Sequence, residues 1–278
     1  MIEEIEDLLG VEVLRRTTAP RFTRYQFPLS PELEQKGVEA ISDELTERLG
    51  LPSRVWADPS FLYVEVPRRW APVTLVCIAL KLHREGQVPP CSPVLGLDEE
   101  SAPLLVNLQK VGHILVLGGR GSGKTELLRT MAASLAIFNK PHDVLLGLIG
   151  RGFREFEGLP HLIRPPAVSR EAALATLNLA LERGKEGGAR VVLFIDEGDF
   201  PPNLMEQAGV HLVVASSEPI LDGYFPLKIV GKGASGRADK LLGQGDFLAC
   251  FGEQAIRFQA AYVRPEEIEA LRYKEVGR

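Results

Sequence analysis

The chain has 278 residues, which is enough for one large domain or two modest ones. Its formal net charge of −5 excludes nucleic-acid binding by overall charge, so any such contact must come from local basic loops. The N-terminus is acidic, the three cysteines have no metal-binding spacing, and no apolar run approaches the ~20 residues of a membrane span, so we expect a cytoplasmic protein without such a span.

The first 90 residues predict a small α+β domain. A short helix is followed by the alternating run 22–27, whose period of two predicts a strand. Apolar residues at helical spacing predict a helix over 38–49, which Gly50 ends, and the run 62–66 predicts another strand. The proline-dense stretch 87–93 is the expected linker to a second domain over 91–278.

Strands and helices alternate in the second domain. Continuous apolar runs predict buried strands at 114–117, 144–149, 191–195 and 211–215, and helical spacing predicts helices at 123–138 and 171–183, the latter with Ser169 as N-cap. Strands that are apolar on both faces are typical of a parallel sheet covered by helices. The predicted fold class is therefore α/β with a mostly parallel sheet.

A phosphate-binding motif joins the first of these strands to its helix. Residues 118–125 fit GxxxxGK[ST], in the strand–loop–helix context that the motif requires. Backbone N–H groups of such a loop cradle a phosphate at the positive end of the helix. We predict that Lys124 bridges the β- and γ-phosphates of ATP and that the Thr125 hydroxyl binds Mg²⁺. The predicted nucleotide-binding residues are Gly118, Gly119, Arg120, Gly121, Ser122, Gly123, Lys124, Thr125 and Glu126.

Two acids end the apolar strand at 191–195. Acids are common caps at strand ends, but here they follow a complete phosphate-binding motif. We predict that Asp196 reaches the Mg²⁺ ion and that Glu197 activates the attacking water. The expected chemistry is in-line attack of water on the γ-phosphate, with ATP and Mg²⁺ as cofactors.

Short motifs along nearly the whole chain resemble the FtsK/SpoIIIE double-stranded-DNA translocases of the FtsK–HerA group. They lie in the family's order at 19–25, 64–67, 95–98, 113–116, 158–162, 209–215, 241–248 and 259–267. The resemblance implies a RecA-like ATPase motor after a smaller domain, assembled as a homo-hexameric ring that moves along duplex DNA. Because the sequence ends soon after the last motif, we expect a motor without the family's membrane anchor and winged-helix module.

Three stretches depart from the family pattern. Residues 150–152 stand where the family has Asp-Pro-Lys, with Glu155 as a candidate for its later acid. Ser217 replaces a glutamine that senses the γ-phosphate, and we expect Ser217 to act there with a shorter reach. The stretch between Asp199 and Gly209 lacks the family's arginines, which in other P-loop enzymes accelerate hydrolysis.

Candidate DNA contacts lie on two glycine-interrupted loops. Lys232 and Arg237 occupy the place of the family's pore-facing segment, and Arg151 and Arg154 follow the second predicted strand. Cations on such loops can follow phosphates without recognising bases. The alternative for both loops is a solvated surface segment.

Two other functions remain open. The altered sensor and the missing arginines favour a nucleotide-gated, ring-forming scaffold with little or no ATP hydrolysis, whereas the complete Asp196–Glu197 pair opposes it. A small-molecule P-loop kinase would need an arginine-rich lid, which the sequence does not contain.

Overall fold

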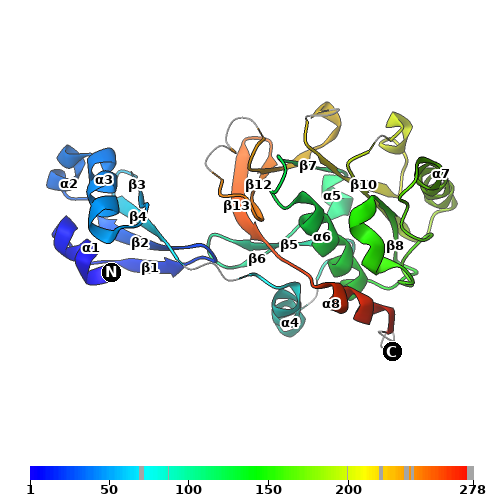
Figure 1. The fold of residues 1–278 in the computed structure, drawn as a ribbon, viewed down its shortest axis with the longest axis horizontal. Helices are drawn as coiled ribbons and strands as arrows, with labels where there is room; N and C mark the ends of the chain where they lie inside the picture. Colours follow the sequence, from blue (N-terminus) through cyan, green and yellow to red (C-terminus); the bar gives the residue numbers. More distant parts are fainter. Residues whose placement is uncertain are drawn as a thin grey trace. The chain divides into compact units, whose positions relative to one another are not determined.

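The computed structural model describes residues 1–68, 72–86, 88–198, 200–218, 222–234, 238 and 241–273 (Figure 1). By its internal contacts the chain divides into two compact units. Unit 1 comprises Met1–Pro72 and Glu99–Ala102, and unit 2 comprises Val73–Asp98 and Pro103–Arg278. This division differs from the boundary expected at 90/91, because helix α4 (Leu75–Glu85) packs on helix α6 (Lys124–Phe138) of unit 2.

Unit 1 is a four-stranded antiparallel sheet whose apolar face is packed against helices. Alternation places Tyr25, Phe27, Leu62 and Val64 on that face, where they join the buried side chain of Ile41. The predicted helix at 38–49 is confirmed, and it ends at Gly50 with φ +63°. The strand order is β1-β2-β4-β3. The elements are α1 (Ile2–Leu9), β1 (Arg15–Thr18), β2 (Phe22–Pro28), α2 (Pro31–Lys36), α3 (Val38–Leu49), β3 (Arg54–Ala57) and β4 (Phe61–Pro67).

Unit 2 is built on a nine-stranded sheet in the order β6-β5-β13-β12-β11-β7-β10-β9-β8. Neighbouring strands from β11 to β8 run parallel, and antiparallel strands extend the sheet beyond β11. The predicted α/β fold is confirmed, whereas the sequence did not predict the antiparallel extension. The strands are β5 (Val94–Asp98), β6 (Pro103–Leu105), β7 (Ile114–Leu117), β8 (Val144–Ile149), β9 (Arg190–Asp196), β10 (Val210–Ser216), β11 (Leu227–Gly231), β12 (Asp246–Phe251) and β13 (Gln254–Ala260).

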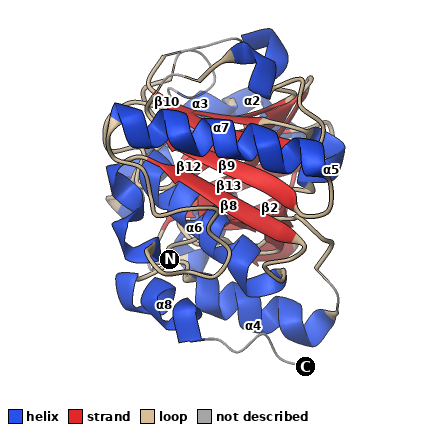
Figure 2. Ribbon diagram, turned by 90° about the vertical axis from the view of Figure 1, so that its right-hand side faces the viewer, coloured by secondary structure: helices blue, strands red, loops and turns tan. Residues whose placement is uncertain are grey.

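Helices cover both faces of this sheet. Neighbouring residues of β7 point to opposite faces: Val116 joins the core beneath α6, and Leu115 joins the core beneath α7 (Arg170–Glu186), which crosses the front of the sheet in Figure 2. The predicted N-cap is confirmed, because the Ser169 side chain accepts a hydrogen bond from Ala172 N. Among the described residues, the remaining helices and 3₁₀ turns are α5 (Leu108–Val111), η1 (Arg151–Phe156), α7 (Arg170–Glu186), η2 (Pro202–Leu204), η3 (Asp222–Tyr224), α8 (Pro265–Ala270) and η5 (Leu271–Tyr273).

The parallel strands bring their carboxyl ends to one edge of the sheet. In register, Ser216 of β10 pairs with Leu117 of β7, and Ala215 pairs with Asp196 of β9. The segments that follow β7, β8, β9 and β10 therefore meet at this edge, although they are far apart in the sequence. Within the described residues, no helix is long and apolar enough to cross a membrane.

Candidate nucleotide site

The phosphate-binding loop turns sharply between β7 and α6. Gly121 (φ +78°) and Gly123 (φ +104°) lie in the left-handed region, where glycine is favoured. Helix α6 begins at Lys124 without a side-chain cap, so that the N–H groups of its first turn remain for a ligand. Those donors and the positive end of a 15-residue helix favour an anion.

Two further glycine-rich loops pack directly on the phosphate-binding loop. Gly119 N donates to Lys232 O (2.8 Å), and Gly245 N donates to Ser122 O (2.8 Å). A Cβ atom added at Gly233 would lie 2.9 Å from Gly119 Cα, so the backbones touch with no room for a side chain. The sequence singled out both segments by resemblance only, and their packing on this loop was not predicted.

Lys124 lies at the centre of the three residues predicted to be catalytic. Its Nζ donates to Gly118 O (2.5 Å) and to Ser217 Oγ (3.4 Å), and lies 3.9 Å from Glu197 Oε1. Ser217 Oγ in turn donates to Glu197 Oε1 (3.1 Å). The side chain of Lys124 is 7% exposed. The structure thus brings together Lys124 from the start of α6, Glu197 from directly after β9 and Ser217 from directly after β10.

The two predicted metal ligands are also adjacent. Thr125 Oγ1 donates to Asp196 Oδ2 at 2.9 Å. Burial raises the pKa of Asp196, and the nearby Glu197 charge raises it further, while the Thr125 hydrogen bond and Lys124 oppose the shift. A hydroxyl and a carboxylate are oxygen donors that suit Mg²⁺, which keeps its other positions for water and phosphate. A divalent cation would favour the ionised carboxylate, so these residues fit the ion.

Glu197 has an unusual backbone conformation beside this pair. Its φ of +57° lies in the left-handed region, which is uncommon for a residue other than glycine. Glu197 is also the residue whose carboxylate contacts both Ser217 and Lys124. Strain concentrated at one acid is typical of functional sites.

A buried arginine next to the Thr125–Asp196 pair was missed by the sequence analysis. Arg129 Nη1 donates to Gly152 O (2.7 Å) and to Glu155 Oε2 (2.9 Å). Burial raises the pKa of the neighbouring Glu126, an effect that the charge of Arg129 opposes. The available signal was the position of Arg129 four residues after Thr125, on the same side of the helix.

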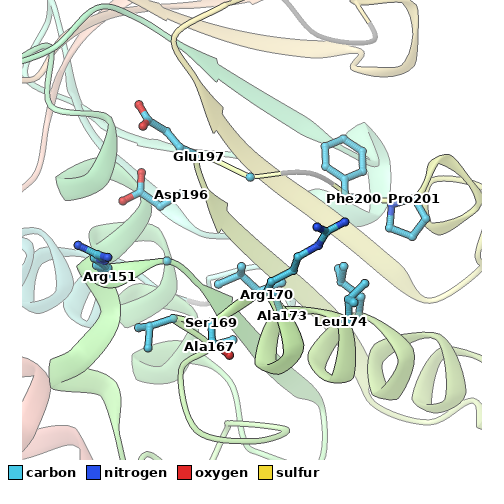
Figure 3. Close-up of a pocket in the computed structure, with 15 residues that line it drawn as sticks. Arg151, Ala167, Ser169, Arg170, Ala173, Leu174, Asp196, Glu197, Phe200 and Pro201 are labelled. Carbon is cyan, nitrogen blue, oxygen red and sulfur yellow. The ribbon is translucent and has the colours of Figure 1, made fainter.

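A cavity of about 790 Å³ opens beside the acid pair (Figure 3). Two arginines line it: Arg151 at the start of η1, and Arg170 at the start of α7. Apolar side chains including Leu174 and Phe200 line the side towards α7 and η2. Arg151, predicted as a DNA contact, therefore lies in the same cavity as Asp196 and Glu197.

Two other candidate DNA contacts, Lys232 and Arg154, are not among the residues that line this cavity. Lys232 is exposed in the turn after β11, and Arg154 is exposed on η1. Arg237 lies outside the described residues. Their role in binding DNA stays a prediction.

Comparison with known proteins supports the resemblance. Residues 75–198 match the model of the FtsK/SpoIIIE family. The DNA translocase FtsK of Streptomyces avermitilis is 25% identical over 92% of this chain and 37% of its own length. The DNA translocase FtsK of Caldanaerobacter subterraneus subsp. tengcongensis is 27% identical over 97% of this chain and 48% of its own length. The chain thus spans less than half the length of these two relatives.

A solved structure supports the fold. The pCW3 conjugation coupling protein TcpA, in a monomer form with ATPγS, matches with a TM-score of 0.56 over 98% of both chains at 15% identity. Such a likeness at low identity concerns the fold alone. Together with the family match over residues 75–198, it supports the fold of a P-loop ATPase domain for unit 2.

Proposed function

We propose, from the match of residues 75–198 to the model of the FtsK/SpoIIIE family, that the chain is an ATP-driven motor that moves along double-stranded DNA. In this proposal it acts in the cytoplasm as a ring of identical subunits, with six as the expected number. The relatives named DNA translocase support the substrate.

The contact of Lys124 and Ser217 with Glu197, beside the Thr125–Asp196 pair, carries the proposal. Bound Mg²⁺ would neutralise charge on the phosphates. Lys124 would exchange its contacts with backbone carbonyls for contacts with the β- and γ-phosphates. Glu197 would orient the attacking water and accept its proton, while Ser217 holds the carboxylate in place.

Contact with DNA would be transmitted through the loop after β11. Lys232 is exposed, and its carbonyl accepts the hydrogen bond from Gly119 N in the phosphate-binding loop. Binding of a DNA duplex to the Lys232 side chain would thus act on the backbone of the phosphate-binding loop, which would surround the phosphates of ATP. Arg151, Arg154 and Arg237 are further candidates for phosphate contacts along the duplex.

ATP hydrolysis measured with and without linear duplex DNA at low salt tests the proposal, with Lys124→Ala as the blank. We expect hydrolysis that rises severalfold with duplex and is lost in the variant. Tight ATP binding with turnover near the blank, unchanged by DNA, would contradict a DNA motor.

One observation favours a second function, a nucleotide-gated ring-forming scaffold with little hydrolysis. The sequence between Asp199 and Gly209 contains no arginine that could accelerate hydrolysis in a neighbouring subunit. The exchange Glu197→Gln separates the two functions. A motor would lose turnover and retain ATP, whereas a scaffold would keep its low turnover and its nucleotide-dependent assembly.

A further inference from the structure

We propose that Arg129 is a positioning residue for the Thr125–Asp196 pair: it holds the segment 150–155 against that pair and so sets how strongly the site binds Mg²⁺. The inference rests on the proposed binding of ATP with Mg²⁺. It adds a residue that belongs to neither the phosphate-binding loop nor the acid pair.

Arg129 joins helix α6 to the segment after β8. It lies one turn beyond Thr125, and its side chain is 8% exposed. Its Nη1 donates to Gly152 O (2.7 Å) and Glu155 Oε2 (2.9 Å), while its Nε lies 3.6 Å from Glu126 Oε2. A buried cation is strongly unfavourable without such partners, so this contact fixes the guanidinium and the segment together.

The segment held by Arg129 touches the metal pair directly. A Cβ atom added at Gly152 would lie 2.4 Å from Thr125 Cγ2 and 3.2 Å from Asp196 Oδ2. A Cβ atom added at Gly150 would lie 2.8 Å from Asp196 Cβ. Because no space separates the segment from the pair, displacement of the segment changes the surroundings of both metal-binding oxygens.

The far end of the segment is anchored independently. Arg272 of η5 donates from Nη2 to Glu155 O at 2.9 Å. The backbone of Glu155 is therefore tied to the C-terminal part of unit 2, and its carboxylate is tied to α6. Loss of the Arg129 contact would release the segment on the metal side only.

The test compares Arg129→Lys and Glu155→Gln with the parent protein. Binding of a fluorescent ATP analogue is titrated with Mg²⁺, and again with Mg²⁺ removed by EDTA. Because supporting contacts around metal ligands typically change affinity 10- to 100-fold, we expect both variants to need roughly tenfold more Mg²⁺ for half-maximal binding. Binding in EDTA should stay near the parental level.

Hydrogen exchange of the backbone amides at 151–156, without nucleotide, gives a second measurement. Both variants should exchange faster there than the parent protein. Arg183→Lys is the matched control, because Arg183 pairs with Glu186 on the exposed side of α7, with 51% and 61% of the two side chains exposed. This control should leave both measurements unchanged.

Parental Mg²⁺ dependence and parental exchange in folded Arg129→Lys and Glu155→Gln would overturn the inference. Failure of the parent protein to bind ATP at any Mg²⁺ concentration would instead overturn the proposed function. In that case the exchange measurement still decides whether Arg129 holds the segment.

Discussion

Ser217 connects Lys124, the predicted phosphate ligand, to Glu197, the acid predicted to activate water. Its hydroxyl donates to Glu197 Oε1 and accepts from Lys124 Nζ, so one small side chain orients two charged groups. A hydrogen bond to a charged group contributes about 1.5–3 kcal/mol, and about 1.4 kcal/mol corresponds to a tenfold change in rate. The serine therefore matters for turnover more than for nucleotide binding.

We predict that Ser217→Ala lowers kcat for ATP roughly tenfold, with little change in KM, because Glu197 loses its donor. Steady-state hydrolysis measures the change, and Ser60→Ala, at an exposed serine of unit 1, is the control. An unchanged kcat would show that Ser217 does not position the acid.

Gly152 shows how closely the backbone approaches the Thr125–Asp196 pair. We predict that Gly152→Ala weakens Mg²⁺-dependent ATP binding by roughly tenfold or more, because the added methyl group overlaps Thr125 Cγ2. Titration of ATP binding with Mg²⁺ measures this. Gly223→Ala is the control, since a Cβ atom there meets nothing within 4 Å. Equal Mg²⁺ titrations for the two variants would contradict the prediction.

At the scale of elements, two histidines fasten the amino ends of β7 and β10 to neighbouring backbone. His113 Nδ1 accepts from Leu212 N (3.1 Å), so its Nε2 carries the proton donated to Met205 O (3.0 Å). His211 Nδ1 contacts Gly112 O at 2.9 Å. Burial lowers the pKa of both histidines below the ordinary value of 6.5.

Because of these two histidines, we predict that the folded protein loses stability in mild acid. Because the pKa of each histidine is below 6.5 in the folded protein, the unfolded chain binds more protons in mild acid. The contribution of the neutral histidines to the free energy of unfolding is therefore complete above pH 6.5, and it declines as the pH falls towards the folded pKa. Urea unfolding at about pH 7.5 and about pH 5.5 measures the difference, which should shrink in His113→Gln. His142→Gln, at a side chain that is 73% exposed, should retain it. An equal pH effect in both variants would exclude His113 as the cause.

Local pattern predicted much of the element content of unit 2. The strands at 114–117 and 144–149 occur as predicted because each is a continuous apolar run between polar turns. The antiparallel strands β12 and β13 were missed, since their pairing depends on partners that no local pattern specifies.

The candidate site was predicted in its residues but not in its contacts. The motif and the acid pair indicated Lys124, Thr125 and Asp196, because their chemistry requires fixed residue types at short spacing. The Arg129–Glu155 pair, the cavity lined by Arg170, and the packing of 232–233 on the phosphate-binding loop join segments distant in sequence. Such contacts follow from sheet order, which periodicity does not encode.

Under the proposed function, a molecule with a net charge of −5 would hold DNA through a few local cations. We predict that Lys232→Ala weakens binding of duplex DNA regardless of sequence and reduces the salt dependence by about one phosphate contact. ATP binding should persist, because the bond to Gly119 uses the Lys232 carbonyl. DNA binding measured over a range of salt concentrations tests this.

Lys110→Ala provides the control, since Lys110 is exposed at the end of α5, before β7 begins. Equal DNA affinity and salt dependence in Lys232→Ala and Lys110→Ala would remove the loop after β11 from the DNA-binding surface.

The chain enters unit 1 twice, first with Met1–Pro72 and again with Glu99–Ala102. The second segment is short, but it makes polar contacts with the first. Glu99 forms an ion pair with Arg24 at 3.0 Å, and Ser101 Oγ donates a hydrogen bond to Thr18 O at 2.7 Å. Unit 1 is therefore not a module that one cut can excise. In a fragment that ends at Pro72, Arg24 would keep its ion pair with Glu65 but would lose the one with Glu99. An exchange of domains between homologues at Pro72 would therefore combine Arg24 from one protein with residue 99 from another, and so would separate two residues that form a pair.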